Sequence, residues 1–163
     1  MEATHFEAIL GNKEELEPML GVRVPDDWPT FPESMPHGYE ILKADATAAN
    51  WGFYLFIHTG DRVLIGEGGF KGRPDREGVV EIGYALVSEY RLRGLATEAA
   101  QGLTHYAFSH PEVMIVQAHT LPDGTASINV LKKLGMKFIS SVQDPEDGEV
   151  LRWRMERRDY RHL

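Results

Sequence analysis

Cysteine is absent from the 163 residues of the sequence. Disulfides, zinc–thiolate sites and cysteine nucleophiles are therefore excluded. Long hydrophobic runs are also lacking, since none approaches the ~20 residues that a helix needs to cross a bilayer. The acidic N-terminus, MEATHFEAIL, lacks the basic and then apolar pattern of a signal peptide. By default, we expect a cytoplasmic protein without a membrane partner.

Positive charge is scarce too, because 25 acidic residues against 17 Lys and Arg give a formal net charge of −8. A nucleic-acid-binding domain usually has a basic face, so we expect no nucleic-acid partner. Apolar residues make up 42% and charged residues 26% of the chain, as is usual in soluble globular proteins. Because one domain typically has ~100–200 residues, the sequence predicts a single domain over residues 1–163.

Turn residues and changes in hydrophobic period divide the chain into short elements. A short helix over 12–20, capped by Asn12, is followed by strands over 53–58, 62–70 and 79–87 that suggest an antiparallel meander. Helical spacing over 94–109 and 126–134 flanks a strand over 113–118, and strands over 137–142 and 149–156 close the chain. This order predicts a mixed α/β (α+β) fold in which helices pack on a sheet.

Residues 21–38 are rich in Pro, Trp and Phe, and they are predicted to form an ordered loop. Packing over the core is favoured over direct ligand contact, and both hold if the loop forms one wall of a pocket. Trp28 is therefore a candidate substrate contact, together with Tyr54 and His58 on the first predicted strand. The late arginines 152, 154, 157, 158 and 161 are interpreted as a solvated strand face and a tail, with an acidic partner as the alternative.

The junction between strand 79–87 and the next helix is the strongest candidate for a binding site. Its sequence is Arg91-Leu92-Arg93-Gly94-Leu95-Ala96-Thr97. The first amides of a helix have no internal partner and carry partial positive charge, so they attract anions. Gly94 allows close approach to the backbone, and the two arginines add full charges. The pattern indicates a phosphate or pyrophosphate, although taken alone it also fits an ordinary helix start with surface arginines.

Two common nucleotide motifs are missing from the sequence. There is no G-x-x-x-x-G-K-[ST] and no G-x-G-x-x-G after a strand. Instead, Arg91-x-x-Gly94-x-Ala96 after Glu81-Ile82-Gly83-Tyr84 resembles motif A of the GNAT N-acetyltransferases. The segment from Ala126 to Met136 resembles the second core segment of that family. The match is closest to the ribosomal-protein N-terminal acetyltransferases (RimJ/RimL type), and it covers residues 81–138 well, 40–80 in pattern only and 1–39 hardly at all.

This resemblance implies a GNAT-like, mostly antiparallel central sheet flanked by helices, with a splayed parallel pair formed by strands 79–87 and 113–119. It implies acetyl transfer from acetyl-CoA to the primary amine of a protein N-terminus or a small molecule, by direct attack and without a metal. A homodimer is common in the family. The loop amides from Leu92 to Thr97 are expected to hold the CoA pyrophosphate, and the strand end from Ala85 to Val87 is expected to pair with pantetheine. The full set of expected cofactor-binding residues is Ala85, Leu86, Val87, Arg91, Leu92, Arg93, Gly94, Leu95, Ala96, Thr97, Ser127 and Leu131.

Acetyl transfer to an amine needs a general base, polarisation of the thioester carbonyl and an acid for the leaving thiolate. Glu81 is the first candidate base, with a structural salt bridge as the alternative role. His119 is a second candidate base or substrate contact, although a structural histidine is favoured. Ser127 matches the family's Asn-x-x-Ser motif and is the candidate acid, while an N-cap is the favoured alternative.

Two departures from the family pattern stand in this segment. Gly124 takes the place of the motif's asparagine, and Leu131 takes the place of the tyrosine that acts as the acid in many members. An active N-acetyltransferase remains the leading hypothesis. A non-catalytic acyl-CoA-binding sensor or regulatory module is the second, and a phosphate-binding domain unrelated to CoA is the third.

Overall fold

The computed structural model describes residues 1–160, which form two compact units. Unit 1 comprises Met1–Gly72 and Tyr84–Arg93, and unit 2 comprises Arg73–Gly83 and the chain from Gly94 onward. Strand β3 (Val79–Leu86) begins in unit 2 and ends in unit 1. A single domain over the whole chain stays a prediction. Among the described residues, no helix is both long and apolar enough to span a membrane.

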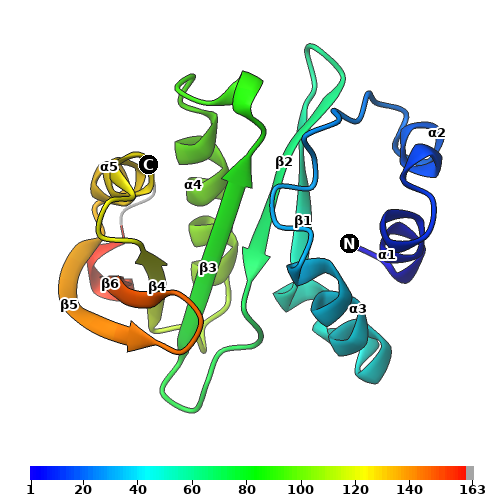
Figure 1. The fold of residues 1–163 in the computed structure, drawn as a ribbon. Helices are drawn as coiled ribbons and strands as arrows, with labels where there is room; N and C mark the ends of the chain where they lie inside the picture. Colours follow the sequence, from blue (N-terminus) through cyan, green and yellow to red (C-terminus); the bar gives the residue numbers. More distant parts are fainter. Residues whose placement is uncertain (161–163) are drawn as a thin grey trace. The chain divides into compact units, whose positions relative to one another are not determined.

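Unit 1 combines three helices with a β-hairpin (Figure 1). Strands β1 and β2 pair antiparallel, and the end of β3 is the next strand beside β2. Helix α1 lies beside α3, where the ring of Phe6 stacks on Tyr39 and meets Phe53 of β1 edge-on. The elements are α1 (Ala3–Leu10), a 3₁₀ turn (Lys13–Glu15), α2 (Leu16–Leu20), α3 (Ser34–Ala44), a 3₁₀ turn (Ala46–Trp51), β1 (Phe53–His58), β2 (Val63–Phe70) and a 3₁₀ turn (Ser88–Tyr90).

Helix α3 corrects the predicted loop over residues 21–38, because the chain becomes helical at Ser34. Pro36 and Gly38 argue against a helix in the sequence, but Pro36 lies in the first turn, where its missing N–H costs no hydrogen bond. A Cβ atom at Gly38 would lie 2.6 Å from the Phe53 ring, so the glycine permits close packing on β1. Tertiary packing has thus overridden local helix propensity.

Unit 2 carries the remaining sheet and two helices (Figure 1). The start of β3 pairs parallel with β4, which pairs antiparallel with β6, and β5 lies antiparallel at the edge. The predicted mixed sheet, mostly antiparallel with one parallel pair, is therefore confirmed. The elements are α4 (Leu95–Ser109), β4 (Ile115–Thr120), α5 (Thr125–Leu134), β5 (Lys137–Asp144), β6 (Gly148–Glu156) and a 3₁₀ turn (Arg157–Asp159).

The two faces of this part of the sheet differ in chemistry. Helices α4 and α5 contact β4, and buried side chains such as Val116, Trp153 and Met155 form the core of the unit. Side chains alternate along a strand, so the residues between these buried positions lie on the opposite face. They are Gln117 and His119 on β4, and Arg152 and Arg154 on β6. This polar face carries the two candidate bases, Glu81 and His119.

Candidate active site

The start of helix α4 has the features expected of an anion site. Gly94 caps the helix with a left-handed φ of 84°, and a Cβ atom there would meet nothing within 4 Å. The amides of Thr97 and Glu98 donate to the Gly94 carbonyl at 3.0 and 3.1 Å. The backbone hydrogen bonds of residues 1–160 do not include the amides from Leu92 to Ala96. The stretch of unbonded amides is thus one residue shorter than the expected range, which ended at Thr97.

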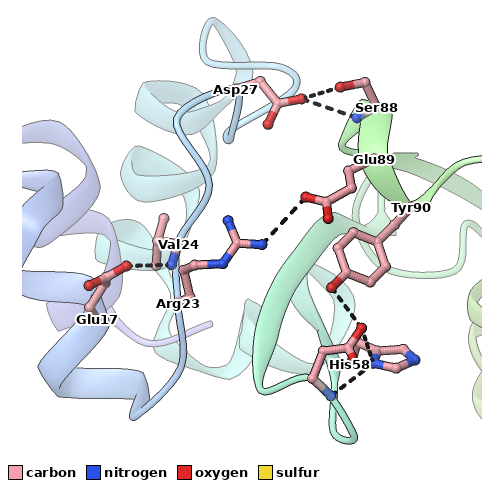
Figure 2. A network of polar contacts seen from close by, with 9 residues as sticks. Glu17, Arg23, Val24, Asp27, His58, Ser88, Glu89 and Tyr90 are labelled. Atoms are coloured by element: carbon pink, nitrogen blue, oxygen red, sulfur yellow. Dashed lines mark hydrogen bonds and ion pairs between the residues drawn. The ribbon is translucent and has the colours of Figure 1, made fainter.

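The 3₁₀ turn Ser88–Tyr90 just before this loop is tied to the N-terminal part of unit 1 (Figure 2). Asp27 accepts hydrogen bonds from the amide and the hydroxyl of Ser88, at 3.1 and 2.8 Å. These two bonds hold the pKa of the Asp27 carboxyl below its usual value. Arg23 lies 3.4 Å from the carboxylate of Glu89. The turn is therefore held by side chains that lie more than 60 residues earlier in the chain.

Three further contacts in unit 1 organise the side chains around the loop. The Tyr90 hydroxyl donates to Asp61 at 2.8 Å, and Figure 2 shows the tyrosine pointing away from the turn toward the β1–β2 connection. Burial and this bond raise the pKa of Tyr90. The Arg93 guanidinium lies 4.9 Å from the centre of the Tyr90 ring, and Arg91 Nε donates to the Leu86 carbonyl at 2.9 Å. Both arginines are thus partly anchored within unit 1.

The strand end that is expected to pair with pantetheine already makes backbone bonds. Leu86 O accepts from Arg91, Val87 N donates to Ile65 O at 2.9 Å, and Val87 O accepts from Tyr90 N at 3.1 Å. The side chains of Leu86 and Val87 are buried, so a ligand reaches this stretch only through its backbone. Leu86 O and both backbone groups of Val87 thus already have partners within unit 1.

Glu81 and His119 meet on the polar face of unit 2. Glu81 Oε1 lies 3.0 Å from His119 Nδ1, at ion-pair distance but off the line of a straight N–H···O bond, and both side chains are 18% exposed. Glu81 Oε2 accepts a hydrogen bond from Gln117 Nε2 at 3.1 Å. Gly83, two residues along β3 on the same face, has open space where a Cβ would point. A half-buried carboxylate with room beside it suits a general base.

Two arginines of β6 support the residues that contact Glu81. Arg154 Nε donates to Gln117 Oε1 at 2.8 Å, and Arg152 Nε donates to His119 Nε2 at 3.4 Å. The pairing registers agree, since Gln117 lies opposite Arg154 and His119 opposite Arg152. Both polar partners of Glu81 are therefore backed by a cation on the next strand.

These contacts correct the interpretation of the late arginines as a solvated face. Arg152 and Arg154 are half-buried, and Arg157 donates to the carbonyls of Val113, Phe108 and His110. Arg158 alone fits the expectation, with an exposed ion pair to Glu156, and Arg161 lies outside the described residues. The alternation of residues 151–155 was visible in the sequence, but it does not reveal that polar partners on β4 line the same face.

Ser127 and Leu131 lie on α5, in unit 2. The helix begins at Thr125 after Gly124, so the alternative role of Ser127 as the N-cap is wrong. Ser127 is half-buried in the first turn, while Leu131 is only 1% exposed and packs in the core. A side chain at position 131 is thus committed to packing.

The candidate substrate contacts of unit 1 differ in exposure. Trp28 is only 1% exposed, and its carbonyl accepts from the Lys13 ammonium at 2.6 Å, which supports packing over ligand contact. Tyr54 is half-buried, and its hydroxyl donates to Asn50 O at 2.8 Å. The ring of His58 packs 5.5 Å from that of Tyr90. Trp28, Tyr54 and His58 belong to unit 1, whereas His119 belongs to unit 2 and lies next to Glu81.

Comparison with known proteins gives the family. A family model described as an acetyltransferase (GNAT) domain matches residues 2–137, which is most of the chain. An uncharacterized N-acetyltransferase, YjdG, of Bacillus subtilis (strain 168) is 32% identical over 118 residues, covering 71% of this chain and 70% of that protein.

Solved structures agree in fold. The ribosomal-protein-S5-alanine acetyltransferase of Vibrio fischeri superposes with a TM-score of 0.69 at 15% identity, over 99% of this chain and 93% of that one. RimL, the ribosomal L7/L12 α-N-protein acetyltransferase, in complex with coenzyme A, gives 0.67 at 16% identity, over 96% and 90%. With the matched residues and the mixed sheet, these findings show that this protein is an acetyltransferase enzyme of the GNAT family.

Proposed function

We propose that this enzyme uses acetyl-CoA to acetylate a primary amine, either a protein N-terminus or a small molecule. The observation that carries the proposal is the run of unbonded amides from Leu92 to Ala96 next to Gly94, where the backbone is open to a ligand. The family uses acetyl-CoA, and a pyrophosphate fits amides at a helix start. Arg91 and Arg93 add positive charge beside them, so these residues would hold the diphosphate.

Glu81 is the proposed general base. Bound acetyl-CoA would supply an activated acyl carbon, and an ammonium acceptor must lose a proton before it attacks that carbon. The Glu81 carboxyl group is oriented by Gln117 and His119, and open space at Gly83 admits an amine or a relaying water. A positioned base of this kind contributes ~10²–10⁴-fold in rate.

Ser127 is the proposed acid for the leaving thiolate. Its hydroxyl lies in the first turn of α5 and does not cap the helix, while Leu131 provides no proton donor. Ser127→Ala should lower kcat with little change in affinity for acetyl-CoA, and Ser127→Thr, which keeps a hydroxyl, should retain most of the activity. Equal rates for Ser127→Ala and the wild type would remove Ser127 from the chemistry.

A protein N-terminus is the acceptor that we place first, in keeping with the RimJ/RimL-like branch. Support comes from the motif resemblance in residues 81–138, and two structural neighbours are named for ribosomal-protein substrates. At 15% and 16% identity those neighbours support the fold and not the substrate. Trp28 and Tyr54 remain proposed acceptor-side residues, and a homodimer remains a proposal.

The test is a thiol-release screen with acetyl-CoA against peptide N-termini and small amines, alongside direct measurement of acetyl-CoA binding. Steady thiol release with at least one acceptor supports the enzyme and names its acceptor class. Tight binding of acetyl-CoA without thiol release from any acceptor would instead favour the non-catalytic sensor. The departures from the family pattern at Gly124 and Leu131 also favour that alternative. Absence of acetyl-CoA binding would refute the assignment of the Leu92–Ala96 amides.

A further inference from the structure

We propose that Arg152 locks His119 as a neutral imidazole with its proton on Nδ1, which makes His119 a positioning residue for Glu81 and excludes it as the base. The proposal rests on the proposed function for its kinetic meaning, but its structural part stands without it. It decides between the two candidate bases that the sequence leaves open.

The first half of the argument concerns Nδ1. This nitrogen lies 3.0 Å from Glu81 Oε1. A lone pair on Nδ1 would face the lone pairs of a carboxylate oxygen at that distance, which is repulsive. A proton on Nδ1 turns the contact into an attraction even though the bond is not straight. The carboxylate therefore selects the protonated Nδ1.

The second half concerns Nε2. Arg152 Nε lies 3.4 Å from it and points its N–H at the ring. A guanidinium has only donors and stays protonated in proteins, so Nε2 must accept with its lone pair. One donor and one acceptor describe the neutral ring in a single tautomer. Protonating Nε2 would remove the acceptor and set two cations against each other.

The other carboxylate oxygen of Glu81, Oε2, also faces a donor that is held by an arginine. Gln117 has an amide that could be turned either way, but Arg154 donates to its Oε1 and so aims Nε2 at Glu81 Oε2. Each oxygen of Glu81 thus faces a donor whose orientation is set by an arginine on β6. The side chain of Glu81 is therefore held in a fixed orientation, which suits a base.

Two other charged side chains on this face form ion pairs of their own. Lys137, opposite Arg154 on β5, lies 2.7 Å from Asp159. Glu156, opposite Ile115, lies 2.7 Å from Arg158. Within the described part of unit 2, Arg152 is the cation bonded to the His119 ring.

The direct test is the ¹⁵N NMR spectrum of the histidine rings at neutral pH, with His119→Asn identifying the His119 signals. We expect a protonated Nδ1 and an unprotonated Nε2 in the wild type. In Arg152→Met, which removes the donor but keeps a long side chain, the carboxylate still holds the proton on Nδ1 and Nε2 is free to take a second one, so we expect signal from a ring protonated on both nitrogens. A wild-type ring protonated on Nε2, or an Arg152→Met spectrum that matches the wild type, would overturn the proposal. This readout needs no turnover, so it also decides the matter in a protein that fails the thiol-release screen.

The kinetic test compares two substitutions of His119. Asparagine places an amide N–H near the position of Nδ1 and cannot act as a base, so His119→Asn should keep most of kcat and the acidic limb of the pH–rate profile. His119→Ala loses the donor, so kcat should fall by tenfold or more and the acidic limb should move to higher pH, because a carboxylate with fewer donors protonates more readily. An equal loss in both variants would identify His119 as the base and refute the proposal.

Discussion

The loop that leads into α4 and the polar face around Glu81 differ in the groups that supply their polarity. The loop relies on backbone amides, and side-chain ties such as Arg23–Glu89 join residues that are 51% and 58% exposed. The face relies on side chains, with Glu81 and His119 each only 18% exposed. Exposed ion pairs contribute ~0–1 kcal/mol, whereas removing a hydrogen-bond partner from a largely buried polar group leaves that group uncompensated. Removing one side chain should therefore impair the function of the polar face far more than that of the loop.

Glu81→Gln gives the largest expected effect. Glutamine keeps the shape and an oxygen acceptor for Gln117, but it cannot take a proton from the acceptor amine. We expect kcat to fall by roughly 10²–10⁴-fold, with acetyl-CoA affinity almost unchanged, measured by steady-state kinetics and calorimetry.

The control for this prediction is Glu81→Asp, which keeps the carboxylate but draws it back toward the backbone of β3. It should recover part of the rate, more so at higher pH. If Glu81→Gln turned over at the wild-type rate at neutral pH, Glu81 would be a structural partner of His119 and nothing more.

The loop is sensitive to changes in its backbone surroundings. Gly94→Asp and Gly94→Asn form a matched pair, since both side chains tolerate a left-handed φ better than other residues and they differ in charge. An aspartate ~6 Å from the pyrophosphate should weaken acetyl-CoA binding roughly 100-fold through like-charge repulsion, while the asparagine variant loses much less. Binding titrations decide the matter, and equal affinities for the two variants would place the diphosphate elsewhere.

The contrast between loop and face also explains what the sequence could predict. The loop is one continuous segment, so Arg91, Gly94 and Ala96 reveal it by spacing alone. The same holds for β1 and α4, whose strand and helix periods match the structure to within a residue. Local signals of this kind need no knowledge of the fold.

The supports of Glu81 were not predictable in the same way. Gln117, Arg152 and Arg154 lie on two other strands, and each has an ordinary structural or solvated role when its own segment is considered alone. Only the pairing of β4 with β6 sets Gln117 opposite Arg154 and His119 opposite Arg152. A one-residue change of register would turn these side chains to the other face, so the site depends on long-range pairing.

Glu67 extends the comparison to a carboxyl in unit 1 that is only 1% exposed. Its Oε1 accepts from the amides of Thr30 and Phe31 at 2.7 and 2.9 Å, yet burial outweighs these bonds and raises its pKa above the usual value. Between the unfolded and the raised folded pKa, the folded protein binds more protons than the unfolded chain. The contribution of Glu67 to stability is therefore full below the unfolded pKa and is lost as pH rises through the folded pKa.

Glu67→Gln should remove this pH dependence. Glutamine keeps the oxygen that accepts from Thr30 and Phe31 but cannot ionise. At pH values above the folded pKa of Glu67, the free energy of unfolding of the variant should therefore exceed that of the wild type. Between the unfolded and folded pKa values, the fall in stability that Glu67 causes with rising pH should disappear. Denaturant unfolding at several pH values measures the difference. A variant that is less stable than the wild type at neutral pH would show that the charged carboxylate is the form that the fold requires.

Asp27→Ala gives the smallest expected effect and tests the exposed side of the comparison. The substitution removes both bonds to Ser88 from the turn that precedes the loop (Figure 2). Because the contact is exposed and worth about 1 kcal/mol or less, acetyl-CoA affinity should fall by no more than about fivefold. Asp27→Asn keeps an acceptor oxygen, so its affinity for acetyl-CoA should lie between those of the wild type and Asp27→Ala. A loss as large as that of Gly94→Asp would mean that the amides from Leu92 to Ala96 are ordered by Asp27, and the loop would then depend on its side chains as strongly as the polar face does.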